Sequence, residues 1–290
     1  MRSFLVITLT IVTLLFSNPT HPVAQKKVPA PIRPPQLSRT ISRHEQRRFP
    51  YGSTLTVVGA PDGSITIEGW TRSEIDIRAE IQLRADTEQD LDLLATVNGV
   101  VLDEDANHIR VLSTGTHDKA YMRATAKKFP KALMGLPWRV DYRIRVPVST
   151  DLDINAGRGT VRISDVEGNI RLSASEGDSS VKLLGGTFAA MIGKGKIDFT
   201  VPSRSWRGSG ADIRVAAGEI NLELPAGFGG DLDAEVLRAG LVVDSYGGLE
   251  PRERQGITPQ KIKVRAGAGG AFFQLTVGDG TINIRKQTAE

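Results

Sequence analysis

Short runs in which apolar and polar residues alternate recur along most of the chain, and many of them begin at a glycine. Four examples are Gly159-Thr-Val-Arg-Ile163, Gly168-Asn-Ile-Arg-Leu172, Gly195-Lys-Ile-Asp-Phe199 and Gly218-Glu-Ile-Asn-Leu222. Alternation with a period of two indicates short strands with one buried face. A glycine in front of a strand marks a bend where a side chain would not fit.

The spacing of these runs predicts how the strands are connected. Each unit is too short for a helix plus a strand, but it can hold one strand and a tight corner. Coils of two or three units would form an all-β, single-stranded β-solenoid with short corners. An antiparallel β-sandwich, whose strands recur every ~8–12 residues, is the alternative. The glycines lie at corners rather than in the Asn-Gly or Asp-Gly pairs of two-residue hairpins, which favours the solenoid.

The repeats resemble a known family, the bacterial putative adhesins, which are exported domains of unknown function. The resemblance is carried by Tyr142-Arg-Ile-Arg-Val-Pro147, Asp151-Leu-Asp-Ile-Asn-Ala-Gly157 and Gly159-Thr-Val-Arg-Ile-Ser-Asp-Val-Glu-Gly168. It spans residues 51–286 and implies a single-chain β-solenoid with a role in adhesion. The family brings no catalytic residues. The chain departs from the family pattern over residues 186–207, where the glycine spacing is lost, and in a long insert near residue 117.

The first fifty residues differ in composition from the rest. Residues 1–24 are predicted to be an export signal, because Arg2 precedes an apolar run from Phe4 to Phe16. Residues 25–50 are rich in proline and basic residues, which predicts a disordered linker. Residues 51–290 are then predicted to form one β-solenoid domain. The chain has no cysteine, so no disulfide and no lipid-bearing cysteine is expected.

The positive charge of the chain belongs to its first fifty residues. The whole chain has 37 Lys and Arg against 33 Asp and Glu, of which residues 1–50 hold eight and one. Residues 51–290 are therefore slightly acidic, which argues against a nucleic-acid-binding domain. The basic N-terminal stretch predicts either a solvated spacer or contact with a membrane surface, lipopolysaccharide or acidic polysaccharide.

One segment interrupts the strands with a different pattern. Over residues 86–97, Thr87 can cap a turn with Asp90 three residues later, and Leu91, Leu93, Leu94 and Val97 fall near helical spacing. The pattern predicts a short helix or an irregular cap that covers one end of the predicted solenoid.

A second unusual segment, His117 to Arg139, mixes cations with aromatic and apolar residues, and its one acid is Asp118. Cations can pair with anionic polymers and aromatic rings can stack on them. The simpler interpretation is a surface loop whose apolar members fold back onto the sheet while its lysines face solvent. If the protein binds a partner, the candidate residues are Lys119, Tyr121, Arg123, Lys127, Lys128, Phe129, Lys131 and Trp138.

The sequence offers little catalytic chemistry. It has four histidines and no His-x-His or His-Glu-x-x-His spacing, so no metal site or cofactor is predicted. A carbohydrate-cleaving enzyme could use two carboxylates on one face, and the pairs considered are Asp151 with Asp153 and Asp165 with Glu167. Solubility alone explains such outward acids.

The favoured hypothesis is a non-enzymatic protein exported to the periplasm, the cell surface or the medium. Its expected partner is an anionic polysaccharide, a cell-wall or envelope component, or the surface of another cell, bound through repeated outward side chains. The expected outward ladder comprises Arg162, Arg171, Lys182, Lys196 and Arg214. A domain that senses envelope stress and an enzyme that cleaves carbohydrate are the alternative hypotheses.

Overall fold

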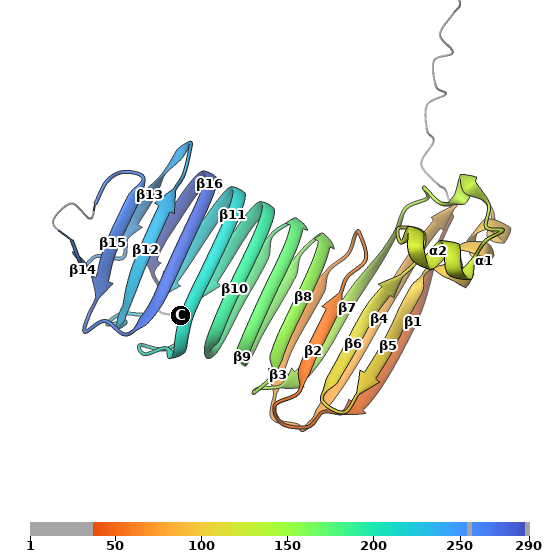
Figure 1. The fold of residues 1–290 in the computed structure, drawn as a ribbon, viewed down its shortest axis with the longest axis horizontal. Helices are drawn as coiled ribbons and strands as arrows, with labels where there is room; N and C mark the ends of the chain where they lie inside the picture. The colour runs from red at the N-terminus through yellow and green to blue at the C-terminus, as the bar shows by residue number, and fades with distance from the viewer. Residues whose placement is uncertain (1–36, 254–256, 288–290) are drawn as a thin grey trace, which may run out of the picture. The chain divides into compact units, whose positions relative to one another are not determined.

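The computed structural model describes residues 37–253 and 257–287 (Figure 1). The predicted export signal, residues 1–24, and the first part of the predicted linker, residues 25–36, lie outside the described residues.

The fold is all-β, as predicted, and its strands form one large mixed sheet that is not closed. The strands before residue 160 are β1 (Leu37–Arg48), β2 (Thr54–Val58), β3 (Ile65–Trp70), β4 (Glu74–Ala85), β5 (Gly99–Asp105), β6 (His108–Thr114), β7 (Trp138–Pro147) and β8 (Asp151–Arg158). The long central strands are β9 (Val161–Glu176), β10 (Ser179–Thr200) and β11 (Arg207–Leu224). The remaining strands are β12 (Gly230–Val236), β13 (Gly240–Ser245), β14 (Leu249–Pro251), β15 (Lys261–Ala266) and β16 (Ala271–Lys286). The helices are α1 (Glu88–Val97), α2 (Lys119–Thr125) and the 3-10 turn η1 (Lys131–Leu133).

The central strands pair in parallel. In β9 and β10, Val161 lies opposite Ser179 and Ile170 lies opposite Phe188, so each of these residues faces one that follows eighteen positions later. The pairs β10–β11 and β11–β16 are also parallel. Antiparallel pairs occur toward the two ends of the sheet, in β1–β4–β7, β5–β6 and β12–β15–β14.

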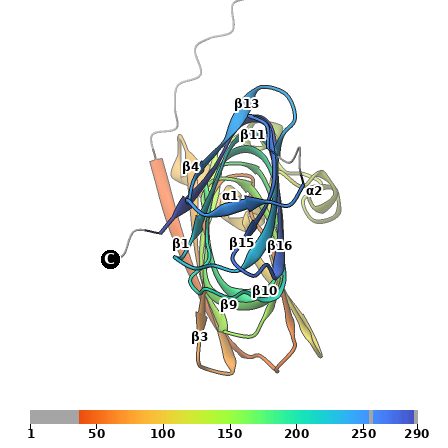
Figure 2. The same cartoon turned by 90° about the vertical axis from the view of Figure 1, so that its left-hand side faces the viewer.

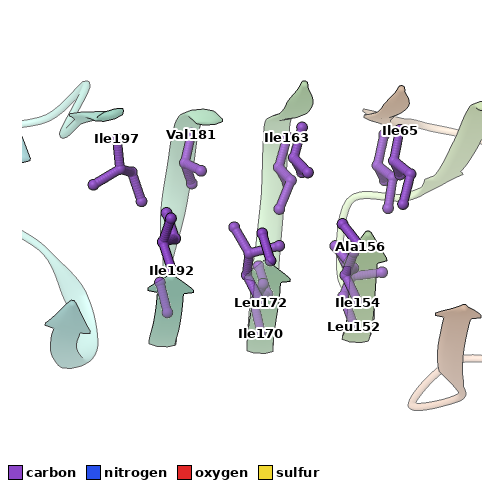
Figure 3. Close-up of a cluster of buried hydrophobic side chains, with 14 of the residues drawn as sticks. Ile65, Leu152, Ile154, Ala156, Ile163, Ile170, Leu172, Val181, Ile192 and Ile197 are labelled. Atoms are coloured by element: carbon purple, nitrogen blue, oxygen red, sulfur yellow. The ribbon is translucent and has the colours of Figure 1, made fainter. Parts of the chain in front are cut away.

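The strands lie in two facing layers around a narrow interior (Figure 2). The long central strands bend and contribute to both layers. Figure 3 shows the result as two rows of buried side chains that face each other, one containing Ile65, Ile163, Val181 and Ile197 and the other containing Ile154, Leu172 and Ile192. Because alternate residues of each strand point inward, the predicted apolar positions form one continuous core.

A column of glycines occupies one set of bends. Gly177 has a φ of 134°, and a side chain there would meet the backbone carbonyl of Gly159. Gly195 stands in the same relation to Gly177. The column comprises Gly63, Gly159, Gly177, Gly195, Gly218, Gly280 and Gly240. The predicted role of glycine at the bends is therefore confirmed at these positions. A side chain is excluded there both by close backbone contact and by the positive φ.

The predicted linker is wrong over residues 37–48, which form β1. This strand pairs with β4 in an unbroken antiparallel register from Leu37 opposite Ala85 to Arg48 opposite Glu74. Its inward positions are mostly charged, so the apolar alternation that reveals other strands is missing. Ile41 packs against the core, and Arg39 pairs with Glu88 and Asp92 of α1 at 2.7 and 2.6 Å. These contacts add to the backbone pairing with β4.

The helix predicted over residues 86–97 is confirmed as α1. Thr87 is its N-cap, and its hydroxyl accepts a hydrogen bond from the Asp90 backbone N–H at 3.1 Å. Leu91, Leu94 and Val97 are buried and α1 packs against β4. Across the part of the chain that the structure describes, no helix has the length and apolar character needed to span a membrane.

Candidate functional site

The cationic segment, residues 117–139, connects β6 to β7 and begins with α2. The Asp118 carboxylate accepts hydrogen bonds from the backbone N–H groups of Ala120 and Tyr121 at 2.8 and 3.0 Å and so caps the helix. The hydrogen bond from Tyr121 lowers the pKa of Asp118 and outweighs the opposing effect of its partial desolvation. The one acid of the segment is thus engaged by the backbone.

The apolar members of the segment fold back onto the sheet. Met122, Leu133 and Trp138 are buried, and Phe129 and Leu136 pack against the core. The Trp138 ring lies 5.3 Å from the His117 ring, centroid to centroid. Trp138 is therefore a core residue and offers no open face on which a ligand ring could stack.

The predicted cations remain at the surface. Lys119, Arg123, Lys127, Lys128 and Lys131 are all exposed. Within residues 37–253 and 257–287, none of these five has a carboxylate at ion-pair distance. Many exposed cations elsewhere have such partners, for example Arg158 with Asp62 at 2.9 Å and Arg285 with Glu223 at 2.6 Å. The structure brings the five cations together on one segment, with Tyr121 half-buried among them.

His117 lies at the start of the segment, where its ring packs beside Trp138. The residue keeps an exposed edge. Partial desolvation of the ring lowers the pKa of His117, and the neighbouring Asp118 acts in the opposite direction. His117 is thus kept mainly neutral near neutral pH, so it adds little to the positive charge of the segment.

The expected outward ladder does not form as one line. Arg171 lies opposite Asp153 and Ala189, and Lys196 lies opposite Glu219. Lys196 also pairs with Asp198 at 3.0 Å, and Arg214 pairs with Asp212 at 2.8 Å. Acidic or neutral neighbours therefore separate these cations, because sequence spacing alone did not give the register.

One member of each carboxylate pair considered for catalysis is engaged in a structural contact. Asp151 accepts a hydrogen bond from the Asn169 backbone N–H at 2.7 Å. Glu167 pairs with Arg207 at 2.6 Å. No group of three or more His, Asp or Glu side chains suited to a metal ion occurs in the described ranges.

A second set of cations, the arginine row, was not predicted as a group, although Arg162 belongs to the expected outward ladder. It consists of Arg78 on β4, Arg143 on β7 and Arg162 on β9, with Thr66 of β3 between the last two. Alternation placed Arg162 on an outward face. The proximity of the three arginines depends on the strand order β4–β7–β3–β9, and no local pattern encodes that order. In Figure 2, α2 lies on the side of the fold opposite β1, β3 and β4.

Comparison with solved structures finds matches of low similarity to bacterial proteins. One is a putative cell adhesion protein from Clostridium sporogenes, with 12% identity, a TM-score of 0.43, and 85% of this chain and 100% of that chain covered. A putative adhesin from Bacteroides fragilis has 10% identity, a TM-score of 0.29, and 86% and 97% covered. A putative lipid binding protein from Parabacteroides distasonis has 11% identity, a TM-score of 0.23, and 85% and 97% covered.

Putative adhesins are thus among the similar structures. They carry the same description as the family that the sequence repeats resemble. The identities and TM-scores are low, so the likeness assigns neither a family nor a function to this chain. No family model matches the chain, and no curated protein matches it.

Proposed function

We propose that this chain is an exported, non-enzymatic protein of the cell envelope or cell surface that binds an anionic polymer through its cationic segment. The observation that carries the proposal is the set of five exposed cations without carboxylate partners among the described residues. Such cations remain available to a partner, and several weak contacts along one polymer add up.

The anchoring of the segment supports this function. Met122, Leu133 and Trp138 fix the segment to the core, so its cations lie on a stable support. A ligand that binds them loses less free energy in ordering the loop than it would on an unanchored loop. Binding by exposed lysines is expected to weaken with ionic strength, because salt screens such contacts.

The scaffold in this proposal is a β-solenoid. Parallel pairing between residues eighteen positions apart supports it, as does the column of glycines, because both are expected where successive coils stack. An antiparallel sandwich would instead join neighbouring strands by hairpins.

Export is the third part of the proposal. Residues 1–24 would serve as the signal and residues 25–36 as a basic spacer before β1. Fractionation of cells with an antibody against residues 51–290 tests this part. Periplasmic or surface location is expected, and a purely cytoplasmic location would contradict it.

Binding is tested with the double substitution Lys127→Gln, Lys128→Gln. Sedimentation with isolated cell walls and with lipopolysaccharide is expected to fall several-fold at low salt. The matched control is Lys182→Gln, Lys286→Gln, which removes two exposed lysines from β10 and β16 and is expected to leave binding unchanged. Equal loss in the two double variants would point to a nonspecific effect of net charge, and full binding by both would exclude the segment.

A further inference from the structure

The arginine row places like charges side by side on the layer that contains β3 and β4. Arg78 and Arg143 are direct partners in the antiparallel pair β4–β7. Arg143 and Arg162 both lie opposite Thr66, one on each side of β3. Strands are ~4.8 Å apart, so the two arginines flank the threonine at a separation of ~10 Å between their backbones. Like charges directly opposite each other destabilise a sheet, so folding alone does not account for the row.

The acids nearby are mostly engaged by other partners. Glu68 lies 3.4 Å from Arg145, and Asp76 lies 2.8 Å from His44 and 3.6 Å from Arg78. Asp141 accepts hydrogen bonds from Arg139 and from the Ser64 hydroxyl, both at 2.6 Å. Within the part of the chain that the structure describes, Arg143 and Arg162 form no ion pair.

The surface beside Arg78 and Arg143 is hollowed. A depression of about 160 Å³ is lined by Thr66, Glu68, Asp76, Arg78, Arg143, Ile144 and Arg145. The row beside it on the same strands contains the opposed acids Glu80 and Asp141. Glu80 and Asp141 on one side of the arginine row and Glu68 and Asp76 on the other repel an anion, so the favourable place for it is the row between them.

We propose that Arg143 and Arg162, with the Thr66 hydroxyl between them, bind a phosphate or sulfate group carried on a larger ligand. A tetrahedral oxyanion directs its oxygens to several sides and can contact two cations and a hydroxyl at once. The planar fork of arginine matches such groups with two parallel hydrogen bonds. A carboxylate has only two oxygens in one plane and fits two flanking arginines less well. This site goes beyond the proposed function, because it lies away from the cationic segment and does not require it.

The direct test is titration of the full chain with inorganic phosphate and inorganic sulfate in a chloride buffer of low ionic strength. Saturable binding is expected, and Arg143→Gln should weaken it at least about tenfold, because it removes charge-assisted hydrogen bonds. The matched control is Arg171→Gln, which removes an exposed arginine of β9 that lies outside the row and should change the affinity less than about twofold. Equal weakening by both substitutions, or no saturable binding by the unmodified chain, would overturn the proposal.

Thermal melting separates binding from a structural role. In phosphate-free buffer, Arg143→Gln should not lower the melting temperature, because it relieves repulsion from Arg78. Phosphate should raise the melting temperature of the unmodified chain but not of this variant. If Arg143→Gln fails to fold, Arg143→Lys keeps the charge without the fork and should bind phosphate with intermediate affinity. A variant that melts lower but binds with unchanged affinity would show that Arg143 is structural.

Two polymers of equal charge identify the chemical group. Dextran sulfate should compete with phosphate for the site, whereas carboxymethyl dextran should compete poorly. Equal competition by both polymers would contradict recognition of a tetrahedral group. The variant Lys127→Gln, Lys128→Gln should bind phosphate normally, so failure of the proposed function and failure of this site are distinguishable.

Discussion

At the scale of single residues, Gly177 shows why glycine recurs at the bends. Its positive φ is unfavourable for any residue with a side chain, and its neighbour in the column, Gly159, leaves no room for a Cβ atom. The same two constraints apply at Gly195.

We expect Gly177→Ala to lower the free energy of unfolding by about 2–5 kcal/mol, from the strained φ and the forced backbone shift. Urea denaturation followed by circular dichroism measures the change. Gly135→Ala is the control, because a Cβ atom there has open space around it, and it should alter stability by less than about 0.5 kcal/mol. Similar losses in the two variants would contradict the steric explanation.

Among the candidate site residues, the sequence identified the exposed cations correctly but not the environment of the rings. Lys127 and Lys128 are exposed, as a solvated segment requires, whereas Trp138 is buried at the start of β7. A tryptophan beside lysines fits a binding surface and a core strand equally well from sequence alone. Only the position of β7 within the sheet decides between them.

At the scale of elements, α1 was predictable and β1 was not. A helix carries its capping signal and apolar spacing locally, and Thr87 with Leu91 and Leu94 supplied both. A strand whose inward positions include Arg39, Arg43 and Arg47 lacks a clear apolar period, and its partner β4 begins 26 residues after β1 ends. Long-range pairing of this kind cannot be derived from a local pattern.

We expect Thr87→Ala to lower the free energy of unfolding by about 1 kcal/mol, because the Asp90 N–H loses its capping acceptor. Chemical denaturation measures this loss, and Thr87→Ser should retain most of the stability. Hydrogen exchange should show faster exchange in the first turn of α1. Unchanged exchange there would mean that packing of Leu91 and Leu94 alone fixes the helix.

At the scale of the whole molecule, the eighteen-residue register of β9 and β10 allows a test of the proposed solenoid. Deletion of residues 177–194 removes one repeat and brings Gly195 to the place of Gly177. We expect the shortened chain to fold, with a β-type circular dichroism spectrum and cooperative melting. Deletion of residues 177–190 is the control, because it is four residues shorter than the repeat. It puts the glycines and apolar residues after the deletion out of register with those of β9 and should abolish cooperative melting. Failure of the first deletion with tolerance of the second would contradict stacked coils.

Stability of the whole fold should fall in acid. Partial burial acts to raise the pKa of Asp141, but hydrogen bonds from Arg139 and Ser64 outweigh it and hold that pKa below its ordinary value. A hydrogen bond from the Arg265 guanidinium lowers the pKa of Asp231. A carboxyl with a lowered pKa in the folded state stabilises the fold above its ordinary pKa, and this contribution is lost as the pH falls through the lowered value.

We therefore expect the free energy of unfolding to decrease slightly below about pH 6 and more steeply below about pH 4. The first decrease comes from His117, whose pKa is lower in the folded chain than in the unfolded chain. As the pH falls, the unfolded chain therefore binds a proton at His117 before the folded chain does, and this favours unfolding. Urea denaturation at several pH values measures the profile. Asp231→Asn should reduce stability at pH 7 and flatten the decrease in acid, whereas a profile unchanged by this substitution would show that the Arg265 pair contributes nothing.

The charged inner side of β1 has a consequence for how the protein behaves at high concentration. β1 is an edge strand, and Arg39, Arg43 and Arg47 lie opposite buried residues of β4. Arg47 pairs with Glu45 at 2.8 Å. A strand from a second molecule that paired with β1 at this edge would have to desolvate these charged side chains. We therefore expect β1 to oppose growth into filaments along its own edge, because of this desolvation.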